Sequence, residues 1–189
     1  MAYYFLVAQL PALAYGEAPP MSSPHFRELC SGGLSAADAA LLPWVALDPW
    51  TPDEEEDGKA ARAENAAGAF SFIARWNEWE RALRLNLAKY RAAKTRREAP
   101  ADVPDFPAGA AAAAKAASAM ASPFEAEIFL GASRWKAIEE FQGLSYFSVN
   151  TVYAYLLKLL LMERRALFRA EEGFSEYKAL YASIMGEAK

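Results

Sequence analysis

One long amphipathic stretch constrains the fold of this chain more than any other feature of its sequence. Between residues 70 and 97, large apolar side chains recur at the spacing of an α-helix, at Phe70, Ile73, Trp76, Trp79, Leu83, Leu87 and Tyr90. The pattern predicts an amphipathic helix of about seven turns, from Phe70 to Arg97. The opposite face carries Arg75, Glu78, Glu80, Arg81, Arg84 and Lys89. We expect this face to meet water or a charged partner, with Glu80 paired to Arg84 one turn later.

The region before this helix predicts short elements joined by a structured loop. Residues 3–10 are aromatic and apolar without a clean period, which is compatible with a short strand or a helix. We favour a helix or an extended packing arm. Glycine and proline make residues 11–24 a loop. Ser23-Pro24 then begins a helix, as a cap residue followed by a proline in the first turn, and Gly32-Gly33 ends it.

A second helix is predicted to begin at Ser35, because Asp38 follows three residues later as in a capping box. Pro43 must lie near an end or a kink of this helix. Its apolar side would consist of Leu41, Leu42, Val45 and Leu47. In residues 48–58 the acidic side chains do not alternate with spacers as they do in a calcium-binding loop. We therefore expect a solvated surface loop there.

Proline and alanine dominate the segment after the long helix. The alanine run that begins at Ala110 has high helix propensity but almost no large side chain to bury. We interpret residues 99–121 as a connector, in which the alanine run could form a thin helix. This connector divides the chain into an N-terminal helical lobe, residues 1–98, and a C-terminal helical lobe, residues 122–189.

Three helices are predicted in the C-terminal lobe. The first begins at Ser122-Pro123 with Glu125 at its third position, ends at Gly143, and has Gly131 on its apolar face to permit a close helix approach. The second runs from Val149 to about Ala170, with an apolar face of Tyr153, Leu156, Leu157, Leu160, Leu161 and Leu167-Phe168. The last runs from Phe174 to Met185.

Together these elements predict an all-α fold, a bundle of long amphipathic helices. The long helix and the helix from Val149 are similar in length, and both end in an aromatic-Arg-Ala step. This faint repeat points to two related helical units, although shared helical periodicity produces part of it.

Charge and composition exclude several classes of protein. A formal net charge of -4 argues against nucleic-acid binding, which depends on an excess of Lys and Arg. The single cysteine, Cys30, excludes an internal disulfide framework. The first apolar residues are not preceded by a basic region, so we expect no secretory signal, and the most apolar run, residues 152–162, is too short to cross a bilayer. These features favour a cytoplasmic protein.

The sequence carries no recognisable catalytic, cofactor or metal motif. His25 and Cys30 are the only residues of their kinds, and their spacing places them on different faces of one helix, so they form neither a zinc set nor a nucleophile pair. No glycine-rich phosphate-binding loop is present. Trp76, Trp79 and Trp135 predict core packing, with an apolar ligand pocket as the alternative. We expect no catalytic residue, no cofactor and no metal.

Several segments together carry a family resemblance. They are YYFLVAQLPALAYGEAPPMSS from residue 3, FRELC from 26, LSAADAALL from 34, WNEWERALRLNLAKYRA from 76, SPFEAEIFLGASRW from 122, IEEF from 138 and YAYLLKLLLMERRALF from 153. In these segments the chain resembles a family of short bacterial proteins associated with V-type (A/V-type) ATPase genes. Members of that family occupy the place of the C subunit of the central stalk, whose eukaryotic counterpart is the d subunit.

The resemblance implies a mechanical role. The central-stalk C subunit is an all-helical, funnel-shaped protein that sits on the membrane rotor ring and receives the central shaft. A chain similar to it would be a shortened, non-enzymatic component that couples the shaft to the ring, peripheral at the cytoplasmic face of the membrane through protein contacts. The candidate contacts with these partners are Arg81, Arg84, Arg164 and Arg165.

Two other functions remain open at this point. The first is an assembly or regulatory factor of the same ATPase, which would share the fold and the partners but bind transiently. The second is a helical carrier or enzyme for an apolar ligand, built around the three tryptophans named above.

Overall fold

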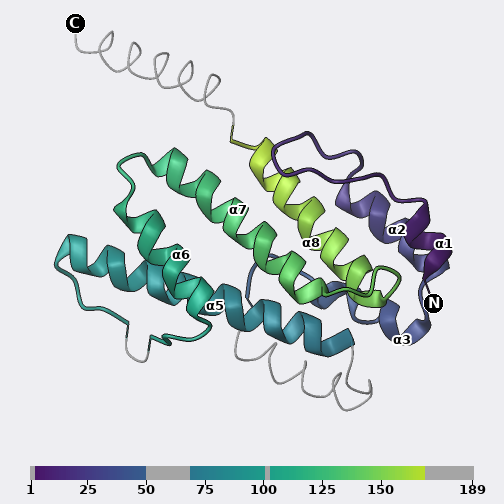
Figure 1. Ribbon diagram of the computed structural model, residues 1–189, viewed down its shortest axis with the longest axis horizontal. Helices are drawn as coiled ribbons and strands as arrows, with labels where there is room; N and C mark the ends of the chain where they lie inside the picture. The colour runs from purple at the N-terminus through teal and green to yellow at the C-terminus, as the bar shows by residue number, and fades with distance from the viewer. Residues whose placement is uncertain (1–2, 50–68, 101–102, 169–189) are drawn as a thin grey trace, which may run out of the picture.

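A computed structural model describes residues 3–49, 69–100 and 103–168, and over these ranges the protein is all-α, without a strand (Figure 1). This confirms the predicted fold class. The helices are α1 (Tyr4–Ala8), α2 (Ser23–Gly33), α3 (Ala36–Ala39), α5 (Ala69–Thr95), α6 (Ala108–Ala119), α7 (Pro123–Gln142) and α8 (Val149–Ala166), and one 3-10 turn lies at Leu42–Trp44. The predicted helix from Phe174 to Met185 and most of the predicted acidic loop lie outside the described residues.

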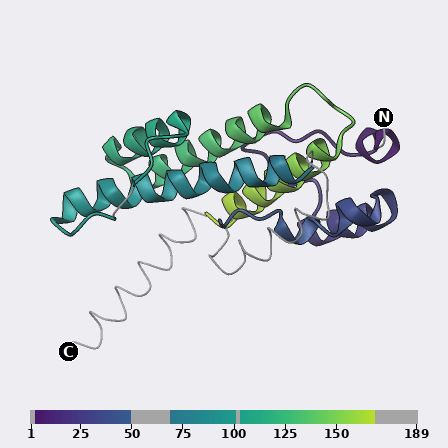
Figure 2. The same ribbon diagram turned by 90° about the horizontal axis from the view of Figure 1, so that it is seen from below.

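The long helix α5 runs along one side of the bundle and spans most of its length (Figures 1 and 2). α7 and α8 form an antiparallel pair that packs against α5, and α6 packs along the C-terminal half of α5. On the other side of α8 lies α2, with α1 beside it. Residues 3–33, here called the N-terminal arm, are therefore joined to the last described helix of the chain.

The predicted apolar stripe of α5 forms the centre of the core. Trp76 and Leu83 are at most 1% exposed, and their neighbours along the stripe are also buried. From α8, Tyr153, Leu156 and Leu157 pack into the same core. Burial of each such side chain stabilises a protein by roughly 1.5–3 kcal/mol, so this core is the main source of stability.

Two of the predicted helix starts are confirmed by their cap hydrogen bonds. The Ser35 hydroxyl oxygen accepts a hydrogen bond from the Asp38 backbone N–H at 3.1 Å. At the start of α7, Ser122 accepts one from the Glu125 N–H at 3.3 Å. Each cap satisfies one of the backbone donors that a helix leaves free at its N-terminus.

The cap of α2 lies one residue earlier than predicted. It is Ser22, whose hydroxyl oxygen accepts a hydrogen bond from the His25 N–H at 3.4 Å. Ser23 is thus inside the helix, and its backbone N–H and its hydroxyl both donate to the Glu163 carboxylate of α8, at 2.6 and 2.7 Å. A carboxylate at a helix N-terminus is stabilised by the helix dipole, so this contact fixes α2 against α8.

The helix predicted from Ser35 is shorter than expected. α3 ends at Ala39, and a 3-10 turn that contains Pro43 follows it. A proline has no N–H to continue the α-helix, and its ring clashes with the carbonyl group four residues earlier. Leu42 and Val45 are nevertheless buried as predicted, because the turn directs them into the core.

α8 ends at Ala166 and does not continue to Ala170 as predicted. Arg164 and Arg165 occupy its last turn, where positive charge suits a helix C-terminus. The sequence predicts Leu167 and Phe168 on the apolar face, but they follow the helix and are 82% and 47% exposed. Their prediction as core residues is wrong because they are no longer in the helical register.

The alanine run forms a packed helix, whereas the sequence predicts little more than a connector. α6 directs four small side chains at its neighbours, Ala110, Ala113, Ala114 and Ala117, and none is more than 7% exposed. Small side chains allow the axes of two helices to approach closely. The preceding segment is also attached to α5, since the Asn86 amide donates to the Pro104 carbonyl at 2.9 Å. The prediction overlooks close packing without large side chains.

Buried residues from both predicted lobes belong to one hydrophobic cluster. Phe26 of α2, Leu83 of α5, Ala114 of α6 and Leu157 of α8 all contribute to it. The division of the chain into residues 1–98, 99–121 and 122–189 stays a prediction.

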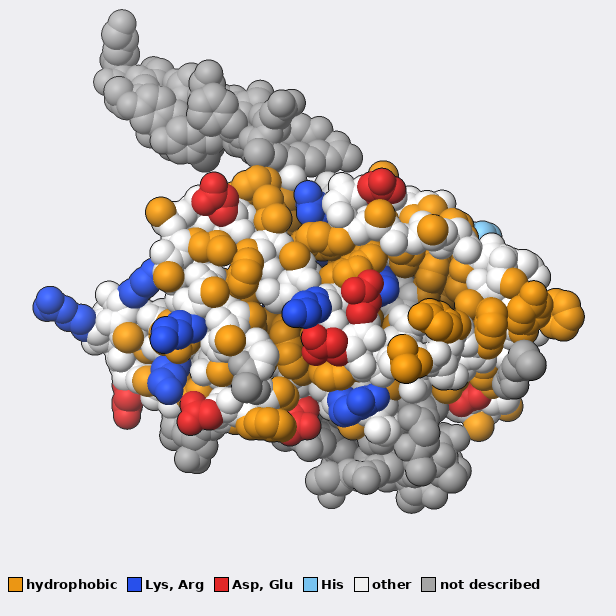
Figure 3. Space-filling model, in the orientation of Figure 1, with side chains coloured by type: hydrophobic (Ala, Val, Ile, Leu, Met, Phe, Trp, Pro, Cys, Tyr) orange, Lys and Arg blue, Asp and Glu red, His pale blue; other side chains and the backbone are white. Residues whose placement is uncertain are grey.

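Hydrophobic side chains gather at the end of the bundle where α1 lies (Figure 3). Phe5 of α1 is 80% exposed, and Leu144 and Tyr146, between α7 and α8, are 89% and 64% exposed. The rings of Tyr4 and Phe147 are 4.8 Å apart and join these two segments. Among the described helices, none combines the length and the apolar character that crossing a bilayer requires.

We expect the close packing of α6 to make it sensitive to added volume. Ala114→Leu should lower the free energy of unfolding by about 1–3 kcal/mol, because an enlarged side chain in a filled site forces its neighbours apart. Ala116→Leu is the matched control, since Ala116 is exposed on the same helix. Urea unfolding measures both. Equal stability of the two variants would contradict the packing described for α6.

Candidate functional site

The carboxylate of Glu80 on α5 is fully buried and lies at the centre of a charged network. Arg134 of α7 binds it through two hydrogen bonds, from Nε to Oε2 at 2.9 Å and from Nη2 to Oε1 at 2.8 Å. Arg84 donates from Nε to Oε1 at 2.8 Å. The predicted pair of Glu80 with Arg84 is confirmed. The sequence leaves open whether the face of Glu80 meets water or a charged partner, and Glu80 itself meets no water but faces the guanidinium of Arg134. A buried carboxylate needs such partners, because an unpaired buried charge costs several kcal/mol.

The network extends from Glu80 in both directions. Arg84 also pairs with Asp48, with 2.5 Å between Nη2 and Oδ1. On the other side, Arg134 Nη1 lies 3.9 Å from Glu127 Oε1, and the same oxygen accepts a hydrogen bond from Arg164 Nη2 at 2.9 Å. Negative and positive groups thus alternate from the segment after α3, through α5 and α7, to the last turn of α8.

The pKa of Arg84 reflects two opposing effects. Burial by itself lowers the pKa of this guanidinium, whereas the hydrogen bonds and negative charges of Glu80 and Asp48 raise it. The second effect is larger, so the pKa of Arg84 lies above its ordinary value. Arg84 therefore keeps its charge throughout the physiological pH range.

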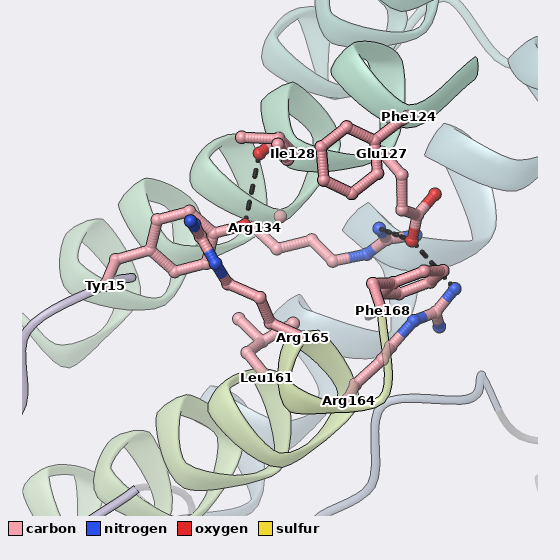
Figure 4. Close-up of a pocket in the computed structure, with 10 residues that line it drawn as sticks. Tyr15, Phe124, Glu127, Ile128, Arg134, Leu161, Arg164, Arg165 and Phe168 are labelled. Atoms are coloured by element: carbon pink, nitrogen blue, oxygen red, sulfur yellow. Dashed lines mark hydrogen bonds and ion pairs between the residues drawn. The ribbon is translucent and has the colours of Figure 1, made fainter. Parts of the chain in front are cut away.

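One end of the network borders a pocket of about 130 Å³ between α7 and the end of α8 (Figure 4). Phe124 and Ile128 of α7 form one apolar wall, and Leu161 and Phe168 form the other. Tyr15, from the loop between α1 and α2, closes the remaining side. The pocket therefore has aromatic and aliphatic walls supplied by three separate segments of the chain.

Three guanidinium groups and one carboxylate also line the pocket, those of Arg134, Arg164, Arg165 and Glu127. Figure 4 shows Glu127 directed toward Arg134 and Arg164, while Arg165 points toward Tyr15. The guanidinium carbon of Arg165 lies 4.9 Å from the centroid of the Tyr15 ring. No ion pair within the described ranges includes Arg165.

Tyr15 is held in place by α7. Its hydroxyl donates to the Ile128 carbonyl at 3.1 Å, and its ring centroid lies 5.6 Å from that of Trp135. Gly131 provides the space, because a Cβ atom there would be only 1.9 Å from the Tyr15 hydroxyl oxygen. The sequence predicts that Gly131 permits a close helix approach, and the structure shows that it admits a tyrosine side chain from the N-terminal arm.

The four arginines predicted as partner contacts are not gathered in one place. Arg164 and Arg165 line the pocket, whereas Arg84 lies at the other end of the network and Arg81 is half-buried on α5. Their role as contacts stays a prediction. Because Arg84 and Arg164 bind carboxylates within the chain, their substitution would also disturb the fold.

The three tryptophans have different surroundings. Trp76 and Trp79 stack with their ring centroids 5.9 Å apart and are 1% and 5% exposed. The indole N–H of Trp76 donates to the Ala46 carbonyl at 2.7 Å. Trp135 packs instead between Tyr15 and the amine of Lys158, which lies 4.8 Å from its ring centroid. Trp76 and Trp79 are therefore core residues, as the main interpretation of their spacing predicts.

Cys30 and His25 lie in different environments. Cys30 is fully buried, and this burial raises the pKa of its thiol to about 11, with a smaller opposing effect from the charge of Arg27. His25 is exposed, and its Nδ1 lies 3.8 Å from the Glu28 carboxylate. In the part of the chain that the structure describes, no group of three or more His, Cys, Asp or Glu residues is placed to hold a metal ion.

Sequence reasoning misses the pairing of Glu80 with Arg134, although a signal is available. Glu80 lies four residues after Trp76 and three before Leu83, so helical geometry places it within the apolar stripe. Within its own helix, helical spacing offers Arg134 the carboxylates of Glu127, Glu139 and Glu140, and Glu127 does lie 3.9 Å from it. Nothing in the sequence indicates that α5 and α7 bring Glu80 and Arg134 together.

A scan against family models and searches of curated proteins and solved structures found no match to this chain.

We expect the buried pair to be essential for stability. Arg134→Met should lower the free energy of unfolding by about 3 kcal/mol or more, because it leaves the buried carboxylate with one partner fewer. Lys136→Met, two residues further along α7, removes a charge that is exposed and should cost about 0.5 kcal/mol or less. Chemical denaturation compares the two variants. If both variants lose a similar amount of unfolding free energy, the buried pair contributes no more to stability than an exposed charge.

We expect the Cys30 thiol to be inert in the folded protein. With a pKa near 11, roughly one thiol in a thousand is ionised at pH 8, and the sulfur is also buried. Ellman's reagent at pH 8 should react slowly with the native protein and promptly after unfolding in guanidinium chloride. A fast reaction of the native protein would show that Cys30 is accessible and activated.

Proposed function

We propose that this chain is a non-enzymatic protein-binding component of a larger assembly, and that the assembly is a V-type ATPase. In this role it resembles the central-stalk C subunit and couples the central shaft to the membrane rotor ring. It would lie at the cytoplasmic face of the membrane and be held there by protein contacts. The family resemblance supports the identity of the assembly, and the charged network supports the mechanical role.

The observation that carries the mechanical role is the chain of ion pairs centred on Glu80. A part that transmits torque must keep its helices from sliding or rotating against one another. The two hydrogen bonds from Arg134 to Glu80 fix both the distance and the orientation of α7 relative to α5. Because this pair is buried, salt screens it much less than an exposed pair. The network therefore favours one rigid arrangement of the bundle.

The surroundings of the pocket support a protein-binding role. Phe124 and Phe168 are each about half exposed, next to Arg164 and Arg165. Aromatic side chains and arginines are enriched at the centres of protein interfaces, where they contribute most of the binding energy. We therefore place the interface with the other ATPase components at this end of α8.

The association itself is tested by purification from the native cell. The protein is tagged, membranes are solubilised gently, and the ATPase components recovered with it are quantified. Recovery of the rotor ring and the shaft at a one-to-one ratio supports a structural role within the complex. Substoichiometric recovery favours an assembly or regulatory factor, and recovery of none contradicts the proposal.

The interface is tested by charge reversal at the end of α8. We expect Arg165→Glu to reduce recovery of the ATPase components about tenfold, since it replaces a central interface cation with an anion. Arg97→Glu, an exposed site after α5, is the matched control and should leave recovery unchanged. Circular dichroism checks that both variants are folded.

Arg164 requires a different design because it binds Glu127 within the chain. The exchange Arg164→Glu with Glu127→Arg keeps an internal ion pair but reverses the order of the charges. Full recovery of the ATPase with this exchange and with Arg165→Glu would remove both arginines from the interface.

A further inference from the structure

We propose that the pocket between α7 and the end of α8 binds a carboxylate carried on an apolar group, preferably an aromatic ring. The inference rests on the charges, the walls and the size of the pocket, and it does not depend on the proposed function.

Among the described residues, the ion pairs around the pocket leave one positive charge without a negative partner. The network pairs three carboxylates with three guanidinium groups, those of Asp48, Glu80, Glu127, Arg84, Arg134 and Arg164. Arg165 adds a fourth guanidinium that has no carboxylate partner among the described residues. Counted over the residues that the structure describes, the pocket thus carries one excess positive charge, on a chain whose formal net charge is -4. A singly charged anion would balance it.

The orientation of Arg165 leaves its hydrogen-bond donors available. The guanidinium carbon lies 4.9 Å from the centroid of the Tyr15 ring, and among the described residues the guanidinium donates no hydrogen bond. The N–H donors of a guanidinium lie in its plane, and their fork matches the two oxygens of a carboxylate. Tyr15 is itself fixed by its hydrogen bond to Ile128, which holds this cation at the edge of the pocket.

A carboxylate already occupies the other side of the pocket. Glu127 accepts a hydrogen bond from Arg164 at 2.9 Å and lies 3.9 Å from Arg134. Its side chain is 28% exposed, so it can move without leaving a buried charge behind. Glu127 therefore acts as an internal competitor for a carboxylate ligand, because both would bind the same guanidinium groups.

The apolar walls and the volume of the pocket determine which apolar group the ligand can carry. Phe124 and Phe168 are 46% and 47% exposed and face the pocket from opposite sides, so a ligand between them would remove apolar surface from water. A dry cavity of about 150 Å³ holds a benzene molecule, and this pocket of about 130 Å³ is close to that size. One ring or a branched aliphatic group fits, with the carboxylate toward Arg165.

The test measures binding of 4-phenylbutyrate to the full chain by isothermal titration calorimetry. We expect saturable binding of the acid and at least tenfold weaker binding of the neutral amide, 4-phenylbutyramide, since a charge-assisted hydrogen bond is lost. No saturable binding of the acid, or equal binding of the acid and the amide, would overturn the proposal.

Two substitutions that should change the affinity for 4-phenylbutyrate in opposite directions make the test specific. Arg165→Gln should weaken binding of 4-phenylbutyrate roughly tenfold because it removes the unpaired cation. Glu127→Gln should strengthen binding severalfold, because it removes the competing carboxylate. The matched controls Arg97→Gln and Glu125→Gln change exposed residues of the same types and should leave the affinity unchanged. Weaker binding by Glu127→Gln would contradict the competitor role and the proposal with it.

The same carboxylate could belong to a free organic acid or to the C-terminal residue of a protein. A tetrapeptide ending in phenylalanine, with its C-terminal amide as control, distinguishes these sources. Tighter binding of the peptide acid than of 4-phenylbutyrate supports a protein C-terminus, and weaker binding supports a free acid. A peptide amide that binds as well as the peptide acid would overturn the proposal. Failure to recover ATPase components from cells would leave these results unaffected.

Discussion

A buried carboxylate determines how the helices α5 and α7 of this protein meet. Glu80 has no contact with water, and a buried carboxylate destabilises the fold unless it has partners such as the guanidinium groups around it. Arg134 reaches it from α7 in a fork geometry that tolerates little rotation, and Arg84 reaches it from the next turn of α5. Apolar side chains alone would allow α7 several similar positions on α5. The ion pairs select one of them, and the pocket at the end of α8 exists because α7 and α8 are held in that position.

Much of the fold could be predicted from local patterns. The stripe of α5 and the caps at Ser35 and Ser122 indicate the correct elements, because helical period and capping act within a few residues. The charged site depends on contacts across the chain. Because glutamate is charged, its residue type predicts that Glu80 is exposed to solvent. Its position at helical spacing from the apolar stripe predicts instead that it faces the core. The packing of α6 escapes prediction for a related reason, since sequence reasoning weighs large side chains and the alanine helix is buried by close approach.

At the end of α8, two neighbouring arginines have different roles. Arg164 belongs to the internal network through Glu127, whereas the guanidinium of Arg165 lies over the ring of Tyr15 and forms no ion pair with a described residue. One arginine therefore holds the helices together while its neighbour is available to an external group. From the sequence the two residues are equivalent, because both are arginines in the last turn of an amphipathic helix. Only the placement of Tyr15 and Glu127 separates their roles, and those residues come from other segments.

The N-terminal arm makes its contacts with residues that are synthesised much later. Tyr15 binds the carbonyl of Ile128, 113 positions further along the chain, and Ser23 binds Glu163, 140 positions further. A ribosome adds about 5–20 residues per second, so the arm spends several seconds of translation without its partners. During that time the Tyr15 ring has no site to enter, since the gap over Gly131 does not yet exist. The arm is therefore among the last parts of the protein to reach its final position. It can dock only after α7 and α8 have packed together.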